Sequence, residues 1–431
     1  MPTIAALLLS AYWVWETVRV VLVETWINSN QLRELERAVR LDPDNPEIPY
    51  RVGTLYLLGM GTGPSDPVSL LRKATDLNPK IGKYWLSLGR ACFAARNQEC
   101  AHQALERALK LSPMTPSTAW EVATYDVFTG RFDESFTQFK RLLYQDPEKA
   151  DDIFRFTWRT FDPETTWRKI VADVPDVRVQ CRYLAFLAQN RRFDVASRNW
   201  TQIVSAPVAP SFDEAEAYLQ QLLEAQRFEQ GLQVWRDLLR RRSLIPPEDD
   251  NKDNLVFNGS FERPPLNAGF DWNSVPANFV SADFSDNLAE SGKHALRVEY
   301  TVPHNIEGEA AYELVPVDPN QKYVLTAYSR SDELTSDRGP ELRIQDAQCS
   351  ACLDVTTDMT LGTTPWHLLR VTFTTGSKTE IVRLSVWRSH GRAFPMEITG
   401  TFWLDGVSLR LASPDGKIGD NQVNPTASNR Q

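Results

Sequence analysis

The sequence is poor in the residues and motifs on which catalysis and disulfide frameworks depend. Its 431 residues include only five cysteines and five histidines, which is too few cysteines for a disulfide-rich scaffold. It contains no Gly-rich phosphate loop, no Gly-x-Ser-x-Gly elbow and no His-Glu-x-x-His motif. We therefore expect a protein that is not an enzyme.

The sequence also lacks an excess of positive charge. The formal net charge is −9, and Lys and Arg form no extended block. A nucleic-acid-binding surface needs clustered Lys and Arg side chains that neutralise backbone phosphates. We therefore expect no nucleic-acid partner.

Two of the five cysteines, Cys349 and Cys352, lie close together in the sequence. No second pair is present to complete a zinc site. They form either a local disulfide in an oxidising compartment or two reduced loop thiols, and both interpretations stay open.

Long hydrophobic runs are absent except near the N-terminus. No residue is charged from Ile4 to Trp15, and apolar character continues to Ile27 around three charged residues. On a helix these three charges fall within one sector, so the rest of its surface is apolar. A spanning helix needs about 20 apolar residues. We expect residues 1–29 to form a membrane anchor, with the soluble domains periplasmic or otherwise extracytoplasmic. The alternative is an amphipathic helix packed on the segment that follows.

The sequence does contain a repeat. Pro43, Pro79, Pro113 and Pro147 recur at intervals of 36, 34 and 34 residues, and each closes a similar phrase. A period near 34 residues is typical of stacked helical pairs. Such a unit presents surface rather than catalytic groups, which favours a binding or scaffolding protein.

The third repeat shows the pattern most fully. Trp85 and Gly89 lie on its expected first helix, and Ala101 and Ala108 on its second, where small residues allow two helices to cross closely. These residues resemble the tetratricopeptide repeat, strongly over 30–147 and more weakly to residue 245. The resemblance implies a right-handed superhelix whose groove binds protein partners.

Short phrases mark where second helices should begin. Gly130 to Ser135 is the usual turn between the helices of one pair. The phrases that start at Arg192 and Arg227 each continue with Phe and an acidic residue. They predict second-helix starts in degenerate units.

The composition changes after residues 246–253, a polar linker that starts with two prolines. Strand-like runs follow, rich in β-branched and aromatic residues and bounded by turn residues. The runs span 295–301, 322–329, 341–345, 366–374, 380–388 and 402–411. Their spacing predicts a β-sandwich, and residues 413–431 are expected to form a disordered tail.

The ends of this region are more specific. It opens with Asn254 to Glu262, which includes an Asn-Gly-x-Phe turn, and closes with Phe402 to Leu409. Residues 254–412 resemble the jelly-roll carbohydrate-binding modules.

That resemblance implies a structural Ca²⁺ that joins the first strand to the last. The matching side chains are Glu262 and Asp405, with backbone oxygens near residues 291–293, and hard oxygen donors suit calcium. Gly406 stands where the family often has a second Asp. The alternative is an ordinary Asp405 that caps a strand turn.

Strand alternation suggests which side chains share a face. We expect Leu325, Ala327, Leu342, Ile344, Leu384 and Val386 to point inward. Thr326, Tyr328, Arg330, Arg343, Gln345, Ser385 and Trp387 would then point outward together.

Five of these residues form the expected carbohydrate site: Tyr328, Arg330, Arg343, Gln345 and Trp387. Aromatic rings beside arginines would suit an acidic polysaccharide or a protein partner. The alternative is that a loop or the helical domain covers Tyr328 and Trp387.

The sequence thus predicts a multidomain protein, an all-α tetratricopeptide-type superhelix over 30–245 followed by an all-β jelly-roll sandwich over 254–412. The expected function is a non-catalytic, membrane-tethered bacterial scaffold. Its repeats would dock protein partners and its β-domain would bind polysaccharide, for example in envelope polysaccharide assembly or export. The alternative is a protein–protein adaptor whose jelly roll does not bind sugar.

Overall fold

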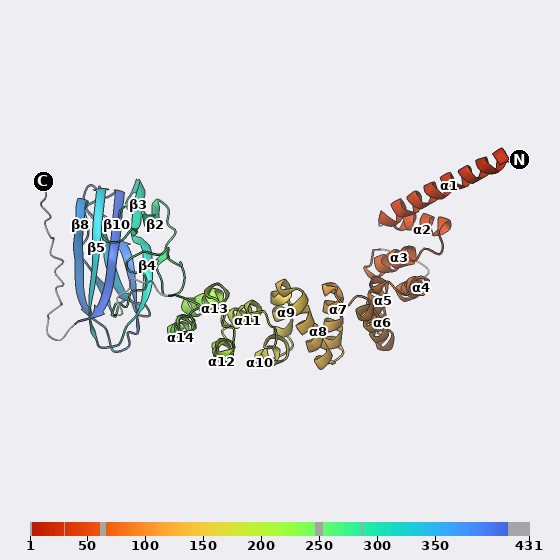
Figure 1. Cartoon of the computed structure of the whole chain (residues 1–431), viewed down its shortest axis with the longest axis horizontal. Coiled ribbons are helices and arrows are strands. Elements are labelled where there is room, and N and C mark those ends of the chain that lie inside the picture. Colours follow the sequence, from red (N-terminus) through yellow and green to blue (C-terminus); the bar gives the residue numbers. More distant parts are fainter. Residues whose placement is uncertain (1, 30, 61–65, 246–252, 286–287, 413–431) are drawn as a thin grey trace, which may run out of the picture. The chain divides into compact units, whose positions relative to one another are not determined.

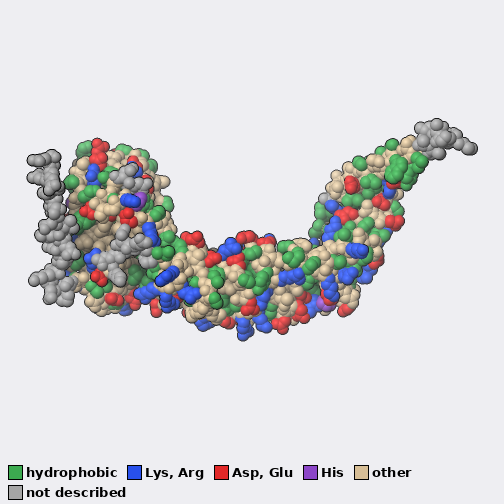
Figure 2. Space-filling model, viewed as in Figure 1, with side chains coloured by type: hydrophobic (Ala, Val, Ile, Leu, Met, Phe, Trp, Pro, Cys, Tyr) green, Lys and Arg blue, Asp and Glu red, His purple; other side chains and the backbone are tan. Residues whose placement is uncertain are grey.

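A computed structural model describes residues 2–29, 31–60, 66–245, 253–285 and 288–412. Helices occupy the first half of the chain and strands the second, as predicted (Figure 1). The chain divides into two compact units, 1–179 and 180–431, each described by itself. Most of the expected linker and the whole expected tail lie outside the described residues. Figure 2 shows Lys and Arg side chains interspersed with Asp and Glu over the visible surface.

The first unit is built from helices that pack as consecutive hairpins, α3 with α4, α5 with α6 and α7 with α8. Its helices are α1 (Pro2–Asn28), α2 (Leu32–Leu41), α3 (Glu47–Leu57), α4 (Pro67–Leu77), α5 (Gly82–Ala94), α6 (Gln98–Leu111), α7 (Pro116–Phe128), α8 (Phe132–Gln145), α9 (Ala150–Trp158) and α10 (Pro163–Thr166), followed by a π-helix at Trp167–Val171.

Small residues bring the two helices of a hairpin together, as expected. A Cβ placed on Gly89 of α5 would lie 2.6 Å from the Leu105 side chain of α6. Ala101 and Ala108 of α6 are fully buried. The helical architecture is therefore confirmed, whereas membership of the tetratricopeptide family stays a prediction.

The N-terminal helix α1 differs from the expectation. Its Val23 and Ile27 are buried in the apolar cluster that includes α2. Arg19 pairs with Glu16 at 2.8 Å and donates to the Leu41 carbonyl at 3.2 Å, so its charge has partners within the protein. Among the described residues, no helix is long and apolar enough to cross a bilayer. This finding overturns the predicted membrane anchor and the localisation based on it.

The second unit begins within α11 (Val177–Gln189) and continues with α12 (Phe193–Ser205), α13 (Phe212–Glu224) and α14 (Phe228–Arg240). Helices α12 and α14 start at the Phe that follows Arg192 and Arg227, as the phrases predicted.

The strands form two five-stranded sheets, with order β1-β4-β9-β6-β7 in the first and β2-β3-β10-β5-β8 in the second. All the neighbouring strands are antiparallel. The strands are β1 (Asn273–Ser274), β2 (Val280–Ser285), β3 (Ala295–His304), β4 (Gly308–Pro316), β5 (Lys322–Leu334), β6 (Pro340–Asp346), β7 (Asp354–Thr356), β8 (Gly362–Thr374), β9 (Ile381–Arg388) and β10 (Ile398–Leu411).

The core lies between the two sheets. All six residues expected to point inward are buried in it, Leu342, Ile344, Leu384 and Val386 from the first sheet and Leu325 and Ala327 from the second. Strands β1, β2, β4 and β7 were not expected. β4 was missed because its sequence, Gly308 to Pro316, mixes glutamates and alanines, which are depleted in strands.

An aromatic contact joins α14 to the sandwich. The ring centroid of Trp235 lies 5.1 Å from that of Phe257 and 5.8 Å from that of Phe270. Gly269 has a φ of 66°, and a Cβ there would lie 2.5 Å from Trp235. Glycine is needed at this position for both its backbone conformation and the close approach of the indole.

Four of the five cysteines form disulfides. Cys349 pairs with Cys352, which matches the first of the two interpretations, and Cys92 pairs with Cys100 between α5 and α6. Cys181 is free and buried.

Candidate functional site

The outer face of the first sheet gathers aromatic and charged side chains. Four strands contribute to it because alternate residues of each point away from the core. We call the following eight residues the first-sheet face: Glu309 and Tyr312 of β4, Glu341, Arg343 and Gln345 of β6, Asp354 of β7, and Arg383 and Trp387 of β9.

The half-buried ring of Trp387 is held by an arginine. The guanidinium carbon of Arg343 lies 4.4 Å from the ring centroid. The same guanidinium donates two hydrogen bonds to Asp354, from Nε at 2.8 Å and Nη2 at 2.6 Å. Two parallel charge-assisted bonds fix both the distance and the plane of the group. The indole Nε1 donates to Ser389 at 3.2 Å, so the Trp387 ring is also oriented by its own polar atom.

The same arrangement recurs on the neighbouring strands. The guanidinium carbon of Arg383 lies 3.4 Å from the Tyr312 ring centroid. Its Nε donates to Glu309 at 3.0 Å, and its Nη2 donates to the second oxygen of that carboxylate. The first-sheet face therefore carries two groups of the same kind, each made of a ring, an arginine and a carboxylate.

Carboxylates outnumber guanidiniums on this face. The Arg343 guanidinium lowers the pKa of Asp354 by hydrogen bonding to it, so this carboxylate stays ionised. Burial raises the pKa of Glu341, which lies opposite Trp387 in the sheet register. Three carboxylates and two guanidiniums share the face. It offers fixed hydrogen-bonding groups without an excess of positive charge.

Helices α13 and α14 adjoin one end of the first-sheet face. A cavity of about 230 Å³ lies where α13 and α14 meet the sheet, and its lining includes Gln220, Glu224, Tyr312 and Arg383. Trp387 is four residues further along β9, or about 13 Å at 3.3 Å per residue. The sequence analysis left open that helices cover the aromatic face. The lining of this cavity includes Tyr312 but not Trp387, so helices adjoin only the Tyr312 end of the first-sheet face.

The five predicted sugar-binding residues do not share one surface. Arg343, Gln345 and Trp387 lie on the first sheet, whereas Tyr328 and Arg330 lie on β5 of the second. The prediction of a single outward face is therefore wrong. Alternation decides whether a side chain points in or out, but it does not decide to which of two opposed sheets the strand belongs.

The second sheet has an aromatic pair of its own. Arg330 lies opposite Trp403 in the register of β5 and β10, with its guanidinium carbon 5.9 Å from the ring centroid. Tyr328 lies on the same strand beside Gly406, at 3.2 Å from a Cβ placed there. The outer face of the second sheet therefore provides a control site for experiments on the first-sheet face.

Several residues of the first-sheet face were missed by sequence reasoning. Glu309 and Tyr312 were missed because β4 was not recognised as a strand. Arg383 could have been found, since it lies two residues before Ser385 on the outward side of β9. Asp354 belongs to a strand of only three residues, which leaves no periodic signal.

The two carboxylates expected to hold calcium have other partners. Glu262 Oε1 accepts hydrogen bonds from the backbone N–H groups of Lys293 at 2.7 Å and His294 at 3.1 Å. Asp405 Oδ2 accepts from the N–H groups of residues 290 and 291, at 2.8 and 3.0 Å. Both carboxylates therefore anchor the segment 290–294.

This arrangement does not fit a shared cation, because the segment presents N–H donors rather than carbonyl oxygens to the carboxylates. Gly292 has a φ of 69°, and a Cβ there would lie 2.2 Å from Glu262 Oε1. Within the described ranges, no group of three or more His, Cys, Asp or Glu side chains is placed to hold a metal. The calcium site stays a prediction.

The fold is that of a helical region followed by a two-sheet β-sandwich, whose first-sheet face carries two ring–arginine–carboxylate groups. No protein-family model and no curated protein sequence matches the chain.

Solved structures similar to the sandwich include carbohydrate-binding modules. A structure described as Family 16 Carbohydrate Binding Module-2 is 16% identical, covers 36% of this chain and 99% of its own, and has a TM-score of 0.26. The C-terminal family 22 carbohydrate-binding module of Clostridium thermocellum Xyn10B is 16% identical, with 38% and 98% coverage and a TM-score of 0.27. A further solved structure that matches part of the chain, the crystal structure of MamA, is 15% identical, with 45% and 88% coverage and a TM-score of 0.26; this match is not assigned to the sandwich. Identities and TM-scores this low carry no argument about function.

Proposed function

We propose that this chain is a non-catalytic binding protein whose β-sandwich binds polysaccharide on the first-sheet face. The observation that supports this is the pair of ring–arginine–carboxylate groups around Trp387 and Tyr312. A sugar ring has an apolar face and a rim of hydroxyls. It therefore needs an aromatic surface flanked by hydrogen-bonding groups that are already fixed in place.

A neutral polysaccharide fits this face better than an acidic one. The acidic ligand was expected because arginines lie beside aromatic rings on the outward strand positions. Arg343 and Arg383 are each bound to a carboxylate, so an anionic sugar would meet Asp354 and Glu309 as well. Paired guanidiniums and carboxylates can still exchange hydrogen bonds with neutral hydroxyls.

The helical half is proposed to dock a protein partner. Three phenylalanines form a row over α5, α7 and α9, with ring centroids 6.3 Å apart for Phe93 and Phe128 and 6.4 Å apart for Phe128 and Phe156. Phe93 is 41% exposed and Phe128 is 69% exposed. Exposed aromatic side chains are enriched at protein interfaces. A scaffold with both sites would suit polysaccharide assembly or export.

The competing function is a protein–protein adaptor whose sandwich does not bind sugar. The contact between α13, α14 and the Tyr312 end of the sheet favours it, because part of the face then serves to join helices and sandwich.

Binding of the full-length chain to a panel of polysaccharides tests the proposal. Neutral polymers such as xylan and β-glucan, and acidic ones such as alginate, are titrated and followed by calorimetry. Trp387→Ala should weaken binding of a neutral polymer by about tenfold or more, because the lost aromatic contact is worth about 1.5 kcal/mol. Trp403→Ala, on the opposite sheet, is the matched control and should bind like the wild type.

Two results would contradict the proposal. Loss of binding in Trp403→Ala with retention in Trp387→Ala would move the site to the second sheet. Absence of binding to every polymer, with both variants folded, would favour the adaptor.

A further inference from the structure

One position recurs at the start of the second helix of three hairpins, α7–α8, α11–α12 and α13–α14. Arg131, Arg192 and Arg227 directly precede α8, α12 and α14. Each backbone N–H donates at 2.8 Å to the carbonyl of the residue five positions earlier. The local backbone is thus the same in all three, and the side chains can be compared directly.

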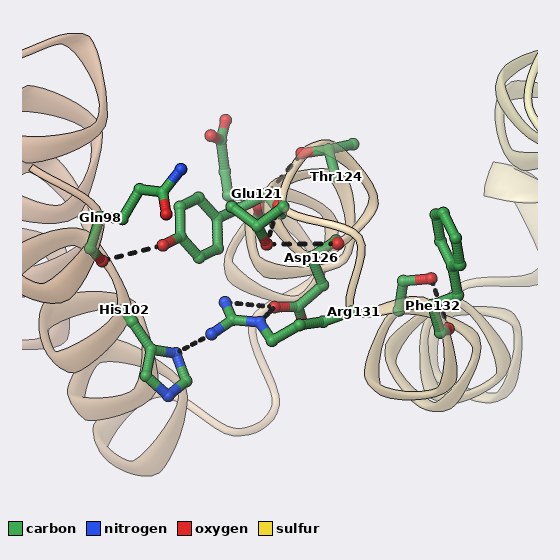
Figure 3. Close-up of polar contacts among 10 residues, drawn as sticks. Gln98, His102, Glu121, Thr124, Asp126, Arg131 and Phe132 are labelled. Atoms are coloured by element: carbon green, nitrogen blue, oxygen red, sulfur yellow. Dashed lines mark hydrogen bonds and ion pairs between the residues drawn. The ribbon is translucent and has the colours of Figure 1, made fainter. Parts of the chain in front are cut away.

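Arg131 is neutralised inside its own hairpin (Figure 3). Its Nε and Nη2 bind Asp126 at 3.0 and 2.7 Å. Its Nη1 lies 2.7 Å from Nδ1 of His102, and its guanidinium carbon is 4.9 Å from the Tyr125 ring centroid. Asp126 is the residue five positions before this arginine, and only 5% of its surface is exposed.

The later hairpins lack that acid. The residue five positions before Arg192 is Leu187, and the one before Arg227 is Leu222, both fully buried. The Arg227 guanidinium instead lies over the ring of Phe193, 4.7 Å from its centroid. This stacking orients the guanidinium toward the preceding hairpin, α11–α12, without neutralising its charge.

The exposed arginines of these two hairpins line one cavity. The cavity has a volume of about 270 Å³, and its charged lining residues are Arg191, Arg192, Arg198, Arg227 and Asp194. Without counting Arg198, the guanidiniums of Arg191, Arg192 and Arg227 against the carboxylate of Asp194 leave a formal excess of two positive charges.

The N-termini of two helices add to the positive electrostatic potential in this cavity. Phe193, the first residue of α12, lines the cavity, and so does Arg227, the residue before α14. Both helices have 13 residues, and the N-terminus of a helix carries about half a positive charge. Anions are stabilised at such ends.

We propose that this cavity binds a tetrahedral oxyanion, a phosphate or sulfate group carried by a larger ligand. Guanidinium forks match such groups because each can donate two parallel hydrogen bonds. A phosphate dianion compensates the excess positive charge more fully than a single carboxylate does. The volume lies at the lower end of ligand pockets, which suits one charged group rather than a whole polymer. This site is separate from the first-sheet face and does not depend on its function.

Calorimetric titration of the full-length chain with inorganic phosphate, sulfate and acetate at constant ionic strength tests the proposal. Phosphate and sulfate should bind saturably with one site. Arg192→Gln and Arg227→Gln should each weaken binding by about tenfold, because a charge-assisted hydrogen bond contributes about 1.5 kcal/mol or more. Arg131→Gln is the matched control, at the equivalent but neutralised position, and should keep wild-type affinity.

Arg227→Lys separates recognition by shape from charge alone. It keeps the positive charge but loses the fork, so binding should weaken, though less than in Arg227→Gln. Melting curves of all variants confirm that they remain folded. Absence of saturable binding, an equal loss in Arg131→Gln, or acetate binding as tight as phosphate would each overturn the proposal. Binding of only one of the two oxyanions would support it and identify the group.

Discussion

Arg343 and Trp387 are held together on the first-sheet face, with the guanidinium carbon 4.4 Å from the indole centroid and Asp354 bound to the far edge of the same guanidinium. The two residues come from neighbouring antiparallel strands, β6 and β9. Because the carboxylate fixes the guanidinium and the guanidinium lies over one face of the indole, the orientation of the other face is set before a ligand arrives. Such preorganisation lowers the entropy lost on binding.

This relationship predicts how binding depends on pH. Arg343 lowers the pKa of Asp354 below its ordinary value of 3.8. A carboxylate whose folded pKa is depressed contributes fully above its unfolded pKa and loses that contribution as the pH falls through its folded pKa. Protonation of Asp354 should therefore not reduce the affinity for a neutral polysaccharide until the pH falls below about 4, the ordinary pKa of Asp. Any change at higher pH would come from Glu341, whose pKa is raised by burial.

Asp354→Asn removes the charge that makes this pair sensitive to acid. Its affinity should be lower than that of the wild type at pH 7, and it should show no fall attributable to this pair in acid. Titrations at several pH values, with far-ultraviolet circular dichroism to confirm folding, measure both profiles. A wild-type affinity that declines between pH 7 and 5 while the affinity of Asp354→Asn stays constant would disagree with the depressed pKa of Asp354.

The carboxylates that anchor segment 290–294 predict the outcome of metal removal. Their oxygens accept backbone N–H bonds, so EDTA should leave the melting temperature unchanged. Asp405→Asn should lower the free energy of unfolding by about 1–3 kcal/mol, because an amide NH₂ would replace an acceptor that faces N–H donors.

Asp283→Asn, at an exposed ion pair 3.4 Å long, is the matched control and should change stability by less than about 0.5 kcal/mol. Thermal melting with and without EDTA and added Ca²⁺ measures both effects. A melting temperature that falls in EDTA and recovers with Ca²⁺ would restore the predicted calcium site.

The close crossing of α5 and α6 predicts a strong effect of volume at Gly89. Gly89→Leu should destabilise the protein by about 1–3 kcal/mol or more, because the added atoms would overlap Leu105. Ala94→Leu, at an exposed position of the same helix, is the control. Urea unfolding followed by circular dichroism compares the two, and equal stability of both variants would contradict the packing.

Some features of this protein could be predicted from local sequence. The recurring prolines and the phrases at Arg131, Arg192 and Arg227 marked helix ends correctly, because a turn depends on residues within a few positions of it. Alternation correctly assigned Leu342, Ile344, Leu384 and Val386 to the core. This assignment succeeded because the backbone of a strand alone makes successive side chains point to opposite faces of the sheet.

Other features depended on a residue that lies outside the recurring phrase. Arg131, Arg192 and Arg227 stand in similar phrases, but only Arg131 meets an acid, since the residue five positions earlier is Asp126 in one hairpin and leucine in the others. The residue in the last turn of the first helix of each hairpin thus determines whether the arginine is neutralised, as Arg131 is by Asp126, or lines a cavity, as Arg192 and Arg227 do.

The composition of the candidate site was decided by tertiary structure alone. Tyr328 and Trp387 both point outward, as alternation required, yet they lie on opposed sheets because β5 pairs with β8 and β10, whereas β9 pairs with β4 and β6. The sequence by itself determined the helical hairpins, the strands with clear periodicity and the inward side of each strand. Sheet membership, and with it the set of residues that share the first-sheet face, arose only from strand pairings between distant segments, since such pairings depend on the packing of the whole core rather than on any local pattern.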